Sequence, residues 1–400
     1  MYPDDADPAR ALQRRLELAL AGAQPARTVI ALSASGRRTI AAICEGCPED
    51  EIFRTGCTTK LLVAALLERK LGALGVNFDV PARRLLGTAA EVLGETTARH
   101  LLEHTHGLDD SNATQAPLRT DGSIDVERLL HGLEGRRIAA PGELYSYSNA
   151  GAIILAAALE SLDGRRFDVL LRDDLLAPLG IDAKQAAGPG ASGSAGICAA
   201  TGNGLALTVG GLLRFLEANA AASIFVDADR RAAPLPGWHP LERGVRLGWK
   251  CYAGGWLGHQ SVWPDASLFL CARPSDRSAV VVASEGHHAA VVAARVLGRS
   301  MPELFAPRMP RRLSPSAAAR LDPSRYCGSY VSAAERVVVE AGSNGLVLES
   351  DGGRARLVPA AGEIFFLDPG ARGRSFVQFI RRARGGRRRL WDGRRVFTSA

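Results

Sequence analysis

The chain has 400 residues, 46% of them apolar and 23% charged, which is enough for one large domain and a small one. It contains no run of 18 apolar residues and no apolar leader, so we expect neither a membrane span nor a signal segment. Seven cysteines, an odd number, favour free thiols in a reducing cytoplasm. The net charge of +7 is concentrated at residues 381–395, where we expect a solvated hairpin and no nucleic-acid site.

In chain order, the first part of the sequence predicts helices between two groups of strands. Strands are expected at residues 28–32, 38–43, 244–252, 267–271 and 279–283. Helices are expected at residues 9–20, 61–67, 80–86, 97–102, 150–162, 205–218 and 289–297. A stretch rich in Gly, Ala and Ser at 186–204 predicts a mobile loop. Strands at both ends indicate an α+β fold in which the last strands join the N-terminal hairpin in one antiparallel sheet flanked by helices.

The last part of the chain predicts a separate, smaller unit. We expect a first domain at 1–306, a Pro- and Arg-rich linker at 307–324, and a small antiparallel β-barrel or sheet domain at 325–400. Its short strands are predicted at 330–331, 336–340, 345–349, 354–358, 364–367 and 376–380. We expect this domain to be dispensable for chemistry, because every motif described below precedes it.

The most apolar helix has a polar start. Every residue from Leu61 to Leu67 is apolar, yet the segment opens with Cys57 and, one turn later, Lys60. Residues three apart share a helical face, and Gly56 lets the chain turn sharply into the helix. The helix start and the lysine both lower a thiol pKa and favour the thiolate. A buried structural cysteine beside a snorkelling lysine is the alternative that this stretch alone leaves open.

Three stretches, in order, resemble the motifs of one enzyme family. Gly56-Cys57-Thr58-Thr59-Lys60 resembles S-x-x-K, Tyr147-Ser148-Asn149 resembles Y-x-N, and Leu257-Gly258-His259-Gln260-Ser261 stands where K-T-G or H-x-G is expected. The phrases at 98–105 and 177–180 agree with the same pattern. Over roughly residues 25–300, the chain therefore resembles the serine β-lactamase and penicillin-binding-protein family, closest to class C β-lactamases and related esterases and D-aminopeptidases.

The resemblance implies an acyl-enzyme with Cys57, Lys60 and Tyr147 as catalytic residues. Lys60 or the phenolate of Tyr147 serves as the base if mutual proximity depresses the two pKa values. Asn149 then orients the lysine and a substrate amide. No metal or other cofactor is implied.

The third motif supplies the remaining substrate-binding residues that the resemblance implies. His259 takes the cationic or hydrogen-bonding place that lysine holds in the family. The backbone N–H of Cys57 and one from the strand near Val262 form the oxyanion hole. Ser261 replaces a glycine that lets a substrate approach the strand, which narrows the cleft and argues against ordinary β-lactam binding.

Cysteine at position 57 is the main departure from the family, which has serine there. A native thiol enzyme, an inactive relative and an introduced substitution all remain open. A thioester is attacked by amines more readily than by water, so we expect transacylation on a small biosynthetic intermediate. Its partners are then a small acyl donor and an amine acceptor, with no nucleic acid and no membrane. Ester or amide hydrolysis and a non-catalytic binding protein are the alternatives.

Two cysteine and histidine patterns suggest metal or redox chemistry instead. His100-Leu101-Leu102-Glu103-His104 matches H-x-x-E-H, the signature of an inverted zincin. The same stretch fits the family's L-L-x-H-T-x-G-L phrase, which needs no metal. Cys44 and Cys47 form a lone C-x-x-C, for which we expect only the end of a strand.

Overall fold

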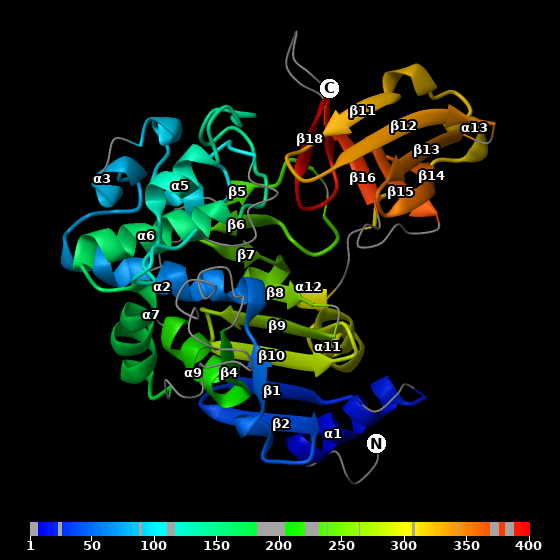
Figure 1. The fold of residues 1–400 in the computed structure, drawn as a ribbon. Coiled ribbons are helices and arrows are strands. Elements are labelled where there is room, and N and C mark those ends of the chain that lie inside the picture. Colours follow the sequence, from blue (N-terminus) through cyan, green and yellow to red (C-terminus); the bar gives the residue numbers. More distant parts are fainter. Residues whose placement is uncertain are drawn as a thin grey trace.

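The computed structural model describes residues 7–22, 26–87, 90–109, 117–181, 205–220, 232–237, 239–263, 265–305, 309–343, 345–368, 376–380 and 388–400. These residues form a large sheet covered by helices and a separate closed barrel (Figure 1). Within this part of the chain, no helix is long and apolar enough to cross a membrane.

The large sheet has eight antiparallel strands and joins the two ends of the first domain. The N-terminal hairpin pairs with the last strand of the domain, Val29 opposite Ala283, as the sequence predicts. In spatial order the strands are β2 (Arg37–Ile43), β1 (Thr28–Ala34), β10 (Ser278–Glu285), β9 (Ala266–Arg273), β8 (Leu257–Val262), β7 (Trp249–Cys251), β6 (Gly244–Arg246) and β5 (Ala233–Pro234).

Helices cover both faces of this sheet because its central strands are apolar on both sides. In β10, Val281 and Ala283 face one core, whereas Val280 and Val282 face the other. The smaller core contains residues of α1 (Pro8–Leu20), α11 (Ala289–Leu297) and α12 (Pro302–Phe305). The larger core contains residues of α2 (Thr59–Ala73), α3 (Ala82–Leu86), α4 (Ala98–Leu102), α5 (Val126–His131), α6 (Ala150–Asp163), α7 (Phe167–Leu170) and α9 (Val209–Asn219).

The central helix α2 is buried nearly all round, as its apolar run predicts. It runs one residue past Gly72, and the chain turns instead at Gly75, whose φ is +66°. The apolar helix α6 lies against α2 and starts directly after Asn149. The starts of these two helices bring the first two motifs together.

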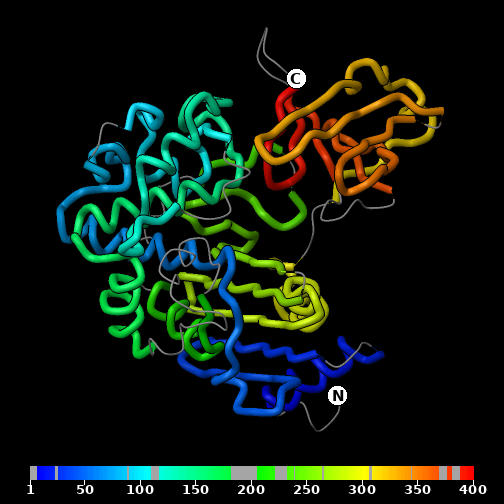
Figure 2. The backbone as a smooth tube through the Cα atoms, viewed as in Figure 1, coloured from blue at the N-terminus to red at the C-terminus, as the bar shows by residue number. Residues whose placement is uncertain are grey.

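The C-terminal strands close into an antiparallel barrel. The sequence predicts either a barrel or an open sheet for this domain. Its core includes Tyr326, Tyr330 and Phe365. The strands are β11 (Gly328–Val331), β12 (Arg336–Gly342), β13 (Gly345–Ser350), β14 (Gly353–Ala360), β15 (Ile364–Asp368), β16 (Phe376–Ile380), β17 (Arg389–Trp391) and β18 (Val396–Ser399). A short helix, α13 (Pro315–Ala318), lies in the stretch before the barrel. Figure 2 shows the last strands returning to the helical part of the first domain.

Three sequence-based expectations need correction. Residues 244–252 form two strands joined by a turn at Leu247 and Gly248, whose φ angles are +46° and +86°. The helix expected from 205 begins later, because residues 206–208 form β4 (Ala206–Thr208), which pairs with β3 (Ile52–Arg54). The side chain of Thr208 then caps α9. The loop expected at 186–204 lies outside the described residues.

The arginine-rich end of the chain is the third correction. Residues 388–395 do form a hairpin, but its strands β17 and β18 close the barrel and pack on the first domain instead of standing in solvent. Arg389 is buried, and its guanidinium donates a hydrogen bond to the Ile138 carbonyl at 2.8 Å. Residues 381–387 lie outside the described part of the chain.

Candidate active site

A tight 3-10 turn, Gly56–Thr58, places Cys57 directly before α2. Gly56 has a φ of +52°, and a Cβ atom built there would lie 2.7 Å from the Cβ of Ser261. Only glycine fits this turn without strain. The hydroxyl of Ser261 donates to the Thr55 carbonyl at 3.0 Å, which ties the turn to β8. Ser261 therefore braces the nucleophile turn, and its hydroxyl is committed to that bond.

Lys60 and Asn149 meet behind the nucleophile, as the motif spacing predicts. The Lys60 ammonium donates to Asn149 Oδ1 at 2.9 Å and lies 5.0 Å from the centre of the Tyr147 ring. Asn149 directly precedes α6, but its side chain does not cap that helix. Its side-chain oxygen can therefore accept the hydrogen bond from Lys60. Lys60 and Tyr147 are both buried, so the charge acts on the pocket with little screening by water.

The proton distribution between Cys57 and Tyr147 favours a thiolate. Burial raises the pKa of the Cys57 thiol, but Lys60, the Tyr147 hydroxyl, Arg394 and Lys250 outweigh it, so the pKa lies below its ordinary value. Burial and the neighbouring thiol raise the pKa of Tyr147 well above its ordinary value. Tyr147 therefore keeps its proton in the resting protein and is no resting phenolate base.

His259 lies in β8, where one ring nitrogen is held by a carbonyl and the other has no hydrogen-bond partner among the described residues. Its Nδ1 lies 2.8 Å from the Gln260 carbonyl, and since a carbonyl only accepts, Nδ1 carries the proton. Burial lowers the pKa of His259 well below its ordinary value, and Lys250 and Lys60 lower it further. The imidazole is therefore neutral, which rules out the cationic role and leaves Nε2 as an acceptor.

The barrel contributes Arg394 to the same pocket. This residue lies in the β17–β18 turn, and its guanidinium carbon is 4.6 Å from the centre of the Tyr147 ring. Its carbonyl accepts the Tyr147 N–H at 2.9 Å. The turn is held by Asp392, whose carboxylate accepts the N–H groups of Arg394 and Arg395. Part of the Arg394 side chain remains exposed to solvent.

A buried ion pair also lines the pocket. Lys250 in β7 bonds to the carboxylate of Glu242. Burial raises the pKa of Glu242, but Lys250 and His239 outweigh it, so the carboxyl stays ionised. The Lys250 ammonium lies 6.0 Å from the centre of the Tyr147 ring. It adds a second cation to the surroundings of the nucleophile.

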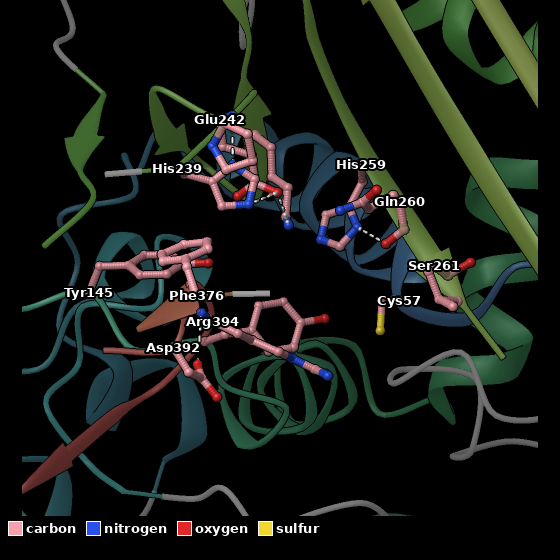
Figure 3. A pocket seen from close by; sticks show the side chains of 15 residues that line it. Cys57, Tyr145, His239, Glu242, His259, Gln260, Ser261, Phe376, Asp392 and Arg394 are labelled. Atoms are coloured by element: carbon pink, nitrogen blue, oxygen red, sulfur yellow. Dashed lines mark hydrogen bonds and ion pairs between the residues drawn. The ribbon is translucent and has the colours of Figure 1, made fainter. Parts of the chain in front are cut away.

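These groups line a cavity of about 270 Å³ (Figure 3). Figure 3 shows Cys57 and Ser261 on one side of it and Tyr145 and Arg394 on another. Val262 also lines it, with an exposed side chain; the oxyanion role of its N–H stays a prediction. The lining residues are Cys57, Tyr145, Tyr147, His239, Pro240, Glu242, Lys250, His259, Gln260, Ser261, Val262, Phe376, Asp392, Gly393 and Arg394.

Sequence reasoning missed several members of the site. Lys250 and Glu242 stand alone in their segments, without a spacing that marks them. His104 was noted only as part of a phrase, yet its ring lies 4.6 Å from that of Tyr147 and its φ is +57°. Arg394 was hidden in a charge-rich run. A positive φ at a buried histidine becomes visible only in the folded chain.

The three residues of the zinc alternative are used elsewhere. His100 Nδ1 accepts the Thr97 N–H in a capping box, Glu103 accepts the Leu247 N–H, and His104 Nδ1 accepts the Ser148 N–H. Among the described residues, no three His, Cys, Asp or Glu side chains are arranged to hold a metal ion.

Comparisons with known proteins agree with this arrangement. The β-lactamase family model matches residues 7–299. Penicillin-binding protein 4 of Amycolatopsis lactamdurans is 30% identical to this chain over 143 residues. The matched segment is 33% of this chain and 35% of that relative, so the chain spans about a third of the relative's length.

Solved structures share the fold. SurE, solved with D-Leu, superimposes with a TM-score of 0.73 at 22% identity over 98% of this chain and 99% of its own. A D-stereospecific amidohydrolase from Streptomyces sp. has a TM-score of 0.56 at 17% identity, over 73% of this chain and 98% of its own. The family model covers most of the sheet domain. The matched range contains all three motifs, which lie at the starts of α2 and α6 and in β8. The chain belongs to the β-lactamase family of enzymes.

Proposed function

We propose that this enzyme transfers an acyl group from a small ester or amide to an amine through a thioester on Cys57. The observation that carries the proposal is the combination of a thiol whose pKa is lowered with a neighbouring phenol that keeps its proton. A thiolate needs no base to attack a carbonyl carbon, and it is an intrinsically strong nucleophile.

In the acylation step, the Cys57 sulfur forms a bond to the carbonyl carbon of the donor. The bond to the leaving group then breaks, and Tyr147 donates its proton to the departing oxygen or nitrogen. Arg394 and Lys60 lie 4.6 Å and 5.0 Å from the ring centre, on which negative charge then develops. The start of α2 supplies N–H groups to the carbonyl oxygen.

The thioester intermediate supports transfer over hydrolysis. Thioesters react with amines in preference to water to a greater extent than oxygen esters do. Hydrolysis is the second candidate, and the name of the D-stereospecific amidohydrolase supports it. The names of the relatives also support a donor with a D-configured acyl group, since SurE was solved with D-Leu.

The test uses the methyl esters of N-acetyl-D-leucine and N-acetyl-L-leucine as donors and glycine amide as acceptor. Intact-protein mass spectrometry should show one acyl group on the wild-type chain and none on Cys57→Ala. Chromatography should show more amide than free acid, and faster reaction of the D-ester. Free acid alone would establish hydrolysis, and an unmodified wild-type chain would leave the binding-protein alternative.

A further inference from the structure

Two buried polar atoms in the pocket are placed to act on a reactant. The Nε2 atom of His259 has no hydrogen-bond partner among the residues that the structure describes, and the Tyr147 hydroxyl interacts with the Cys57 thiol. Their rings lie 6.3 Å apart, centre to centre, and both line the cavity that contains Cys57. A buried polar atom without a partner is costly, and such atoms mark places where a reactant or water is bound.

The neighbouring contacts give each atom a different chemistry. Nδ1 of His259 is committed as a donor to the Gln260 carbonyl, so Nε2 carries a lone pair. Tyr147 retains its proton, so its hydroxyl is a donor. In Figure 3, the His259 ring nitrogen that is not bonded to Gln260 is turned into the pocket. One atom can thus take a proton from a reactant, and the other can give one.

We propose that His259, through Nε2, is the general base that deprotonates the acceptor amine when the thioester is resolved. This step rests on the proposed thioester function. The amine nitrogen forms a bond to the thioester carbon while its proton moves to Nε2. The C–S bond breaks, its electron pair returns to sulfur, and the Cys57 thiolate is restored. When Tyr147 has protonated the leaving group, the imidazolium then returns its proton to Tyr147. When the leaving group departs as an anion, the imidazolium gives its proton to solvent.

A donor whose leaving group departs as an anion separates the two candidate bases. With p-nitrophenyl acetate, nitrophenolate leaves without a proton, so Tyr147 stays protonated and is no base for the second step. Only His259 is then available to accept the proton of the amine. The experiment therefore uses this ester with glycine amide as acceptor, and follows nitrophenolate release and the mass of the intact protein.

His259→Asn is the sharpest variant, because the asparagine amide can keep the bond to the Gln260 carbonyl while Nε2 is lost. We expect a full first burst of nitrophenolate, accumulation of acetylated protein, and steady turnover that is lower by ~10²–10⁴-fold. Added imidazole should restore part of the turnover in His259→Ala. Tyr147→Phe should not accumulate acetylated protein.

The pH profile gives a readout that a merely structural role would not change. Lys250 of β7, Lys60 of α2, Arg394 of the barrel turn, His104 and Tyr147 surround the imidazole. The cations disfavour its protonation, so the deacylation rate should stay level from neutral pH to below pH 6.5. It should fall only in stronger acid, and the fall should be absent in His259→Asn.

Three results would overturn the inference. The first is a turnover in His259→Asn equal to that of the wild-type protein, and the second is the absence of a nitrophenolate burst in His259→Asn. The third is acetylated protein that accumulates in Tyr147→Phe but not in His259→Asn. Failure of the proposed function looks different, because the wild-type protein would then show neither burst nor acetylation.

Discussion

The guanidinium of Arg394 lies 4.6 Å from the centre of the Tyr147 ring, although one residue belongs to the barrel and the other to the sheet domain. The Tyr147 N–H also donates to the Arg394 carbonyl at 2.9 Å. Ala139 and Leu144 share an apolar cluster with Trp391 of the barrel. The barrel thus lines one side of the pocket that contains Cys57, and this contact argues against the expectation that the barrel is dispensable for chemistry, which stays a prediction.

Replacing Arg394 with Gln should raise the pKa of Cys57, because one of the charges that favour the thiolate is removed. A rise of one pKa unit corresponds to a roughly tenfold lower thiolate fraction below the pKa. We therefore expect iodoacetamide alkylation of Cys57 at pH 7 to slow by up to about tenfold. Arg394→Lys should keep most of the rate. Arg354→Gln, at an exposed arginine of the same barrel, is the matched control; equal rates in all four proteins would exclude this role.

Cys57 should be the first cysteine to react with limiting iodoacetamide at neutral pH. The pKa of Cys57 is lowered, whereas burial raises the pKa of Cys251 to about 12 and raises that of Cys271 well above its ordinary value. The rate should increase with pH and level off below the pKa of an ordinary cysteine, because only the thiolate reacts. Peptide mapping gives the order of labelling. Faster modification of Cys44 or Cys47 would contradict the prediction.

Much of the first domain could be predicted because its signals are local. The cap at Asp7, the Ser35-Gly36 turn and the apolar run of α2 each specify an element within a few residues. The positions of Cys57, Lys60 and Asn149 followed from motif spacing, since each stands at the start of a helix.

The remaining part of the site depends on contacts between distant segments. Arg394 reaches Tyr147 only because β17 and β18 close the barrel against the first domain. The pairing of Lys250 with Glu242 depends on the β6–β7 turn, which the sequence suggested as one continuous strand. Protonation states were equally inaccessible, because the pKa of Tyr147 is set by burial.

Gly56→Ala should destabilise the fold and impair acylation. The new Cβ would meet Ser261 Cβ at 2.7 Å and Trp263 Nε1 at 2.8 Å, at a φ of +52°. Gly75→Ala is the control, because its φ is +66° and nothing lies within 4 Å. Both variants carry backbone strain, so the difference reports the clash, which we expect to cost about 1–3 kcal/mol.

Urea unfolding of the two glycine variants gives that difference directly, and alkylation of Cys57 shows whether the turn has moved. Only Gly56→Ala should change the alkylation rate. Equal loss of stability in both variants would mean that backbone strain alone matters at Gly56.

Cys57→Ser should acylate more slowly and divert product toward hydrolysis. A serine hydroxyl needs a base, and Tyr147 holds its proton because burial and the neighbouring thiol raise its pKa. Removal of the thiol relieves only the second of these causes, so Tyr147 stays a poor base for the serine hydroxyl. Without efficient base catalysis, the acylation rate should fall by about 10²–10⁴-fold.

The oxygen ester formed by the serine variant discriminates less between amine and water than the thioester does. The ratio of amide to free acid, measured from N-acetyl-D-leucine methyl ester with excess glycine amide, should therefore be lower for the serine variant. Free acid alone from both proteins would replace transfer with hydrolysis.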